Sequence, residues 1–292
     1  PPNHEADYSD YTQRLIQQRF IKPAHWLDFG GLHELPAEEF FGVAHWQLFK
    51  GIDAPYKSLL KLMLLEAYAS EYPAVDWLCM ETKRAVFSND DIDTDTVDPY
   101  QLILRRISTY LDARNEPERL QLARRAFYFK AGQVLANPTR LHDWRQQQML
   151  KQCNAWGWSG EEIALLDTRP AWKLERVVEE RNALVSELSR SYRLLTECTR
   201  EQDATANLDT RELALLGRKL YAALDKRPGK IDRVNPGISK DLSERTLWLK
   251  RTDDQPPRWQ LFLHPPEMAA HQPAKTSMSV VEILAWLHLN GI

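Results

Sequence analysis

The segment from Pro170 to Arg200 reads PAWKLERVVEERNALVSELSRSYRLLTECTR. Its apolar side chains recur at three- and four-residue intervals, which is the spacing of one face of an α-helix. They are Leu174, Val177, Leu184, Leu188, Tyr192 and Leu195. At 1.5 Å per residue, a helix of about 30 residues spans about 45 Å. The segment therefore predicts one long helix with an apolar seam, which we interpret as a strut between subdomains.

The residues before this helix predict a succession of shorter helices. Apolar residues at helical spacing, preceded by capping residues or proline, indicate them. The predicted ranges are 9–20, 36–50, 55–72, 99–111, 116–135, 141–155 and a short helix near 161. Glycine supports this interpretation, because only 11 of 292 residues are glycine, against an average usage of about 7%. Tight turns and glycine-rich phosphate-binding loops must therefore be scarce.

The pattern changes after Ala206. A helix predicted over 209–224 is ended by Pro228-Gly229. Short segments rich in β-branched and aromatic residues follow, separated by turn-forming residues. They are Lys230–Val234, Thr246–Arg251 and Trp259–Leu263, and a last helix is predicted over 279–289. The sequence thus predicts a mainly α chain, with a multi-helix domain at 1–206 and a small α+β subdomain at 207–292 that holds a short antiparallel sheet.

Composition excludes several classes of protein. The formal net charge of −3 gives no overall attraction to nucleic acid. No apolar run approaches the roughly 20 residues that a membrane span needs, and the sequence shows no signal-peptide pattern, so we expect neither a membrane span nor a leader. Three widely separated cysteines fit a reducing cytoplasm better than a disulfide framework. The chain begins without methionine and stops directly after an apolar helix, so we expect a segment of a longer cytoplasmic protein.

Some patterns imitate functional motifs but have simpler interpretations. Asp93 and Asp95 resemble a metal-binding carboxylate pair, yet they lie in a polar run, which favours a solvated loop. Gly30-Gly31 lacks the following Lys-Ser or Lys-Thr of a phosphate loop, which favours a plain turn. The eight histidines show no ligand spacing, and the ten tryptophans are spread as packing residues would be. We therefore predict no metal site and no catalytic residue in this chain.

Basic residues offer a candidate for binding phosphate groups. Arg124, Arg125 and Lys130 share a predicted helix with three aromatic residues, and Lys57 begins another helix. Such cations are suited to a triphosphate. The sequence alone favours the alternative that their stems cover apolar neighbours while their charges stay in water. Asp98 is equally ambiguous, because the role of N-cap before Pro99 explains it fully.

Several strings closely resemble, in order, strings of the class I adenylate cyclases of Gram-negative bacteria. They are WLDFGGL (26–32), AEEFFG (37–42), WQLFKGIDAPYK (46–57), LLEAY (64–68), DPY (98–100), RRAFYFK (124–130), WGW (156–158), LDTRPAWK (166–173), RKLYAAL (218–224), NPGISKDLSE (235–244) and HQP (271–273). The similarity covers nearly the whole chain. Long runs in a fixed order are far more specific than a short motif.

The resemblance implies a lyase that converts ATP to 3′,5′-cyclic AMP and pyrophosphate with Mg²⁺. In that family a nucleotidyltransferase-like core carries a Gly-Ser loop and a metal-binding D-x-D strand, and a regulatory half follows. Both core motifs would lie upstream of this chain, so the resemblance implies that Mg²⁺ is bound outside it. We expect this segment to contact that core and the regulatory half, and to be inactive alone.

Within that resemblance, the candidate ATP-binding residues are Lys57, Asp98, Arg124, Arg125 and Lys130. An alternative is a non-catalytic regulatory or scaffold module that relays partner binding to the core. A helix-turn-helix nucleic-acid binder suits the helical content but not the net charge. Residues alone do not identify a regulatory partner or an oligomeric state.

Overall fold

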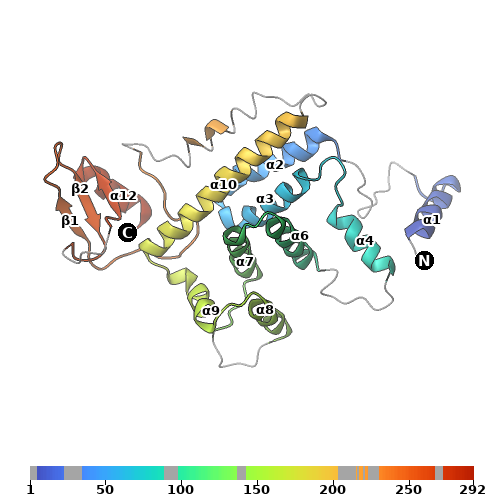
Figure 1. Cartoon of the computed structure of the whole chain (residues 1–292), viewed down its shortest axis with the longest axis horizontal. Coiled ribbons are helices and arrows are strands. Elements are labelled where there is room, and N and C mark those ends of the chain that lie inside the picture. The colour runs from blue at the N-terminus through green and yellow to red at the C-terminus, as the bar shows by residue number, and fades with distance from the viewer. Residues whose placement is uncertain are drawn as a thin grey trace. The chain divides into compact units, whose positions relative to one another are not determined.

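Helices dominate the computed structural model, which describes residues 5–22, 35–88, 98–136, 143–202, 215, 217–219, 221–222, 230–266 and 272–292, without the side chains of 5–9, 87 and 88. The helices before residue 170 are α1 (Glu5–Gln17), α2 (Ala37–Asp53), α3 (Pro55–Ala69), α4 (Leu78–Ser88), α6 (Pro99–Ala113), α7 (Pro117–Ala131), α8 (Trp144–Ala155) and α9 (Gly160–Asp167). A 3₁₀ turn, η2 (Arg169–Ala171), precedes α10 (Leu174–Gln202). The prediction of a mainly helical chain is therefore confirmed (Figure 1).

The long helix α10 forms where the apolar seam predicted it. It has 29 residues, and five of the six seam residues are buried: Leu174, Val177, Leu184, Leu188 and Leu195. Tyr192 is partly exposed. Burial of one continuous apolar stripe stabilises this helix far more than intrinsic propensity does.

The contacts divide the chain into two units. Unit 1 comprises Pro1–Leu48, Leu59–Phe127 and Ser191–Thr210, and unit 2 comprises Phe49–Ser58, Tyr128–Arg190 and Arg211–Ile292. Helices α2, α3, α7 and α10 each contribute residues to both units. The predicted boundary near residue 206 lies outside the described residues, so the division at 206/207 stays a prediction.

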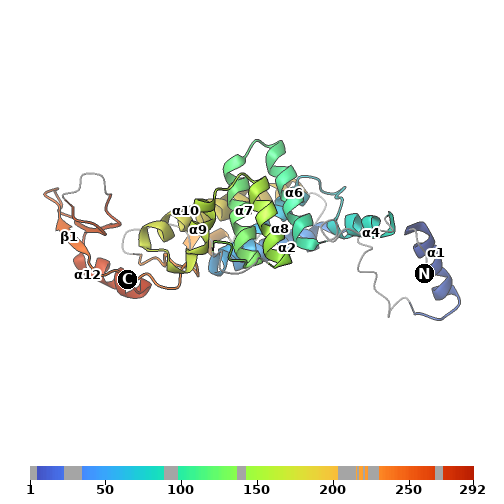
Figure 2. The ribbon, with the colours of Figure 1, turned by 90° about the horizontal axis from the view of Figure 1, so that it is seen from below.

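Unit 1 has a helical core. Its largest fully buried side chains come from α2, α3, α6 and the C-terminal part of α10, and include Phe40, Phe41, Leu62, Met63, Ile107, Leu111 and Leu195. Phe40 stacks on Tyr72 with ring centroids 5.4 Å apart. Helices α6 and α7 lie side by side in both views (Figures 1 and 2). Helix α4 was not predicted, because Met80 is the one buried side chain among those described in it and its apolar pattern is weak.

Unit 2 includes a small antiparallel sheet, as predicted. Its strands are β1 (Trp248–Arg251), β2 (Trp259–Phe262) and β3 (Lys275–Ser277), in the order β1-β2-β3. In the register, Trp248 faces Phe262, and Trp259 faces Ser277. Helix α12 (Val280–Asn290) lies beside the sheet in Figures 1 and 2 and contacts β2 and β3.

The prediction of a strand at Lys230–Val234 is wrong. The backbone of this segment bonds to a side chain instead, since Asn290 accepts from the Val234 amide at 2.8 Å and donates to the Asp232 carbonyl at 3.1 Å. Strand β3 was missed because its three residues, Lys-Thr-Ser, carry no apolar alternation. The Asn290 side chain therefore bonds to backbone groups that the sequence pattern predicted to be paired with another β-strand.

No helix within the described ranges combines the length and the apolar character that crossing a membrane would require.

Candidate functional site

The five residues proposed from the sequence are divided between the two units. Asp98, Arg124 and Arg125 belong to unit 1, and Lys57 and Lys130 belong to unit 2. Lys57 and Lys130 are exposed, whereas Arg124 and Arg125 are partly buried on α7. Burial lowers the pKa of Arg124, and the charge of Asp112 acts in the opposite direction. Each unit therefore holds its own subset of the candidate cations.

Asp98 is the N-cap of α6, as the sequence predicted. Its Oδ1 accepts hydrogen bonds from the backbone amides of Tyr100 and Gln101, both at 2.9 Å. These two bonds satisfy helix-terminal donors that otherwise have no intrahelical partner. Capping thus accounts for the position of this carboxylate.

In unit 2, three strings that carry the family resemblance meet in one aromatic cluster, which we define as Tyr56, Phe129 and Trp172. The Tyr56 and Phe129 rings meet edge to face with centroids 5.1 Å apart. Phe129 and Trp172 meet in the same manner at 6.0 Å. Tyr56 and Phe129 directly precede Lys57 and Lys130, so the structure brings together the immediate neighbours of two predicted cations.

Besides Lys57 and Lys130, which follow two of these rings in the sequence, a further cation, Arg169, contacts the aromatic cluster itself. The Arg169 guanidinium lies over the Phe129 ring at 4.5 Å and over the Tyr56 ring at 5.4 Å from the centroids. Both distances are within the range in which a ring quadrupole attracts a cation. Arg169 forms no side-chain hydrogen bond or ion pair with the described part of the chain.

The carboxylates near the cluster are engaged with other groups. Tyr56 donates its hydroxyl to Glu180 at 2.8 Å. Asp167 accepts from the Tyr128 hydroxyl at 2.6 Å and from the amides of Leu135 and Ala136 at 2.9 and 2.8 Å. Burial, followed by the bond to Asp167, raises the pKa of Tyr128 well above its usual range, so this phenol stays protonated.

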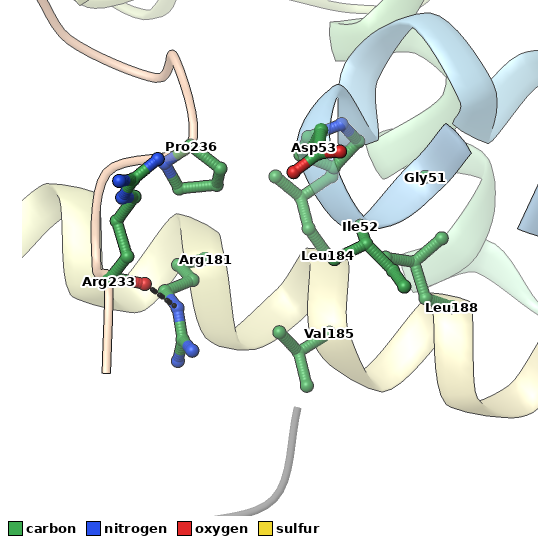
Figure 3. Close-up of a pocket in the computed structure, with 10 residues that line it drawn as sticks. Gly51, Ile52, Asp53, Arg181, Leu184, Val185, Leu188, Arg233 and Pro236 are labelled. Carbon is green, nitrogen blue, oxygen red and sulfur yellow. Dashed lines mark hydrogen bonds between the residues drawn. The ribbon is translucent and has the colours of Figure 1, made fainter. Parts of the chain in front are cut away.

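A separate cavity of about 280 Å³ lies in unit 2, beside α10 (Figure 3). Leucine and valine side chains of α10 form its apolar wall, and Asp53, Arg181 and Arg233 supply charge. A hydrogen bond to the backbone holds the Arg181 side chain: its Nε donates to the Arg233 carbonyl at 3.0 Å, which is the dashed line in Figure 3. The side chains of Arg233 and Asp53 lie on opposite sides of this view (Figure 3).

Metal ligands do not gather in this chain as far as it is described. Within those ranges no group of three or more His, Cys, Asp or Glu side chains could hold a metal ion. Asp93 and Asp95 lie outside the described residues.

The order of the strings and the helical fold agree with a comparison against protein families. The family described as "Adenylate cyclase, class-I, second domain" matches residues 35–235. The chain belongs to the class-I adenylate cyclases. The expectation drawn from the strings is confirmed at the level of the family.

Curated relatives agree with this family. Proteins named adenylate cyclase from Yersinia intermedia, Salmonella typhimurium strain LT2 and Escherichia coli strain K12 are 39%, 37% and 36% identical to this chain. Each alignment covers 100% of this chain and 35% of the relative. The chain thus spans about a third of the length of these adenylate cyclases. None of the solved structures matches it.

Sequence reasoning missed Arg169. The residue stands within LDTRPAWK, one of the strings that resembled the family, but an arginine before a proline has no distinctive pattern. Its position over two rings depends on residues 113 and 40 positions earlier in the chain, Tyr56 and Phe129. Contacts of that separation are not visible in local periodicity.

Proposed function

We propose that this chain is the domain of a class-I adenylate cyclase that packs on the catalytic core and contributes cations to the binding of ATP. The observation that carries the proposal is the match of residues 35–235 to the second domain of that family. The whole enzyme would form 3′,5′-cyclic AMP and pyrophosphate, as a cytoplasmic lyase. The chain alone would be inactive, because the core that binds Mg²⁺ would lie outside it.

The chemistry explains why cations are needed. The ribose 3′-oxygen attacks the α-phosphorus in line, a new P–O bond forms, and the bond from the α-phosphorus to the β-phosphate oxygen breaks. The 3′-hydroxyl proton is lost and pyrophosphate leaves with the electron pair. Negative charge develops on the departing group, and fixed positive side chains stabilise it. Lys57, Arg124, Arg125 and Lys130 are our candidates for this electrostatic role.

Charge reversal in the full-length cyclase tests the proposal. Each of Lys57, Arg124, Arg125 and Lys130 is replaced by Glu, one at a time, and cyclic AMP formation is measured against ATP concentration. We expect a raised KM for ATP or a lowered kcat of about tenfold or more in at least one variant, since loss of one charged contact costs about 1.5–3 kcal/mol. Asp98→Asn separates capping from function, because Asn also caps helices well.

Arg245→Glu is the matched control for these variants. Arg245 is an exposed arginine whose side chain forms no hydrogen bond or ion pair within the described ranges, so its reversal changes the net charge equally and should leave both constants unchanged. Wild-type kinetics in all four test variants would contradict the proposed role.

A further inference from the structure

We propose that Arg169 is the anchor of a binding site for the phosphate oxygens of ATP or pyrophosphate, built on the aromatic cluster of Tyr56, Phe129 and Trp172. This site goes beyond the four cations predicted from the sequence. The choice of ATP and pyrophosphate as ligands rests on the proposed function. The site itself would bind any small molecule that carries several phosphate groups.

The cation–π contacts hold the Arg169 guanidinium next to two rings and use none of its N–H groups in a hydrogen bond to the described chain. Contacts to the Phe129 and Tyr56 rings, at 4.5 and 5.4 Å, engage the charge of Arg169 rather than its N–H groups. A guanidinium carries five N–H donors in a planar fork that matches phosphate oxygens in pairs. Stacking on rings therefore prepares this side chain for an anion.

The rings that support Arg169 are themselves held in place. The Tyr56 hydroxyl donates to Glu180 at 2.8 Å, and the Trp172 indole donates to the Leu165 carbonyl at 2.9 Å. Arg169 begins the 3₁₀ turn η2, in which the Trp172 amide donates to the Arg169 carbonyl at 3.1 Å. A site held in this way loses little conformational entropy when it binds a ligand.

The donors of Arg169 have no acceptor in the described chain. Its nitrogens are not among the buried polar atoms that lack a partner, so they remain open to solvent. The carboxylates of Asp167 and Glu180 accept hydrogen bonds from the Tyr128 and Tyr56 hydroxyls and form none with Arg169. An anion from outside the chain can therefore reach these donors and replace water as their acceptor.

The surroundings of the cluster add positive charge. Lys57 and Lys130 directly follow the two rings that Arg169 covers, and both are exposed. Arg176 lies over the Trp172 ring at 5.1 Å, although it pairs with Glu179 at 3.0 Å. Exposed cations around one fixed guanidinium favour a ligand with several negative charges.

Isothermal titration calorimetry on the 292-residue chain tests the site. Sodium pyrophosphate, ATP and adenosine are titrated separately at low ionic strength, where screening is weak. We expect pyrophosphate and ATP to bind and adenosine not to bind. Arg169→Gln should weaken pyrophosphate binding at least tenfold, and Arg169→Lys, which keeps the charge but loses the planar fork, should weaken it less.

Controls make the test decisive. Arg245→Gln removes an exposed arginine and should bind pyrophosphate like the wild type, and circular dichroism confirms that each variant is folded. Absence of pyrophosphate binding by the wild-type chain would overturn the site even if Arg169→Gln failed to fold. Equal affinity of wild type and folded Arg169→Gln would overturn it as well.

The calorimetric test of the Arg169 site can fail without the charge-reversal test of the proposed function failing, and the reverse also holds. If the chain binds no pyrophosphate while charge reversal still impairs the full-length cyclase, the Arg169 site is wrong and the proposed function stands. If Arg169→Gln abolishes binding while every charge reversal leaves the cyclase unchanged, the site stands and the proposed role of the four cations is wrong.

Discussion

Glu66 is a fully buried carboxylate in unit 1 with a complete set of partners. Arg119, whose side chain is 6% exposed, donates Nη2 to both carboxylate oxygens at 3.0 and 2.8 Å. The Ser191 hydroxyl also donates to Glu66. Burial, followed by the charge of Glu66, raises the pKa of Tyr110 to about 12. This network joins α3, α6, α7 and α10 within one unit.

Removing Glu66 should therefore be costly to stability. Glu66→Ala leaves the buried Arg119 charge with Glu116, at 2.6 Å, as its remaining carboxylate partner, and the expected loss is about 3 kcal/mol of unfolding free energy. Urea denaturation followed by circular dichroism measures it. The matched control is Asp76→Ala, because the Asp76–Arg84 pair at 2.7 Å is about half exposed and should cost about 1 kcal/mol or less. Equal losses in the two variants would contradict this account of the network.

At the residue scale, the sequence indicated only part of the candidate site. The capping role of Asp98 was visible, because an acidic residue before Pro99 is a local pattern. Lys130 was proposed from the aromatic residues of its helix and Lys57 from its place beside another helix; both lie in the family strings, and their role stays a prediction. Arg169 was not found, because stacking on Tyr56 and Phe129 is a property of the fold and not of any local spacing.

At the scale of elements, α2 contains two glycines with different surroundings. A Cβ at Gly42 would meet nothing within 4 Å, whereas a Cβ at Gly51 would lie 2.6 Å from Leu188 Cδ2. Leu188 is buried on the apolar seam of α10. The two positions thus share a helix but differ in the space available to an added methyl group.

Alanine at these two positions should have different effects on stability. Gly42→Ala should raise the unfolding free energy by about 0.5–1 kcal/mol through helix propensity. Gly51→Ala should forfeit that gain, because Leu188 must shift at a typical overpacking cost of about 1–3 kcal/mol. Thermal and urea denaturation of both variants give the comparison. An equal gain in both would show that Leu188 does not pack against Gly51 as described.

Elements with a strong period were predictable, and those without one were not. The seam of α10 and the Asp98 cap of α6 located two helices from local signals. Segment Lys230–Val234 has β-favouring residues, yet the side chain of Asn290, more than fifty positions later, satisfies its backbone. Tertiary hydrogen bonds of this kind override local propensity.

At the scale of the whole molecule, low glycine content and family membership support the same interpretation. A chain with 11 glycines in 292 residues has little material for a glycine-rich nucleotide cradle. It matches the second domain of class-I adenylate cyclases and spans 35% of the length of the Escherichia coli relative. Both observations are the basis of our proposal that the chain is a helical supporting domain and that the catalytic carboxylates lie elsewhere in the enzyme.

The most direct test of that claim is the activity of the chain by itself. The purified 292-residue chain is incubated with ATP and Mg²⁺, and cyclic AMP is quantified by mass spectrometry, with the full-length adenylate cyclase from Escherichia coli as the positive control. We predict cyclic AMP no higher than in a sample without protein. Formation of more than one cyclic AMP per chain would contradict the account, because it would show that the catalytic groups lie within these 292 residues.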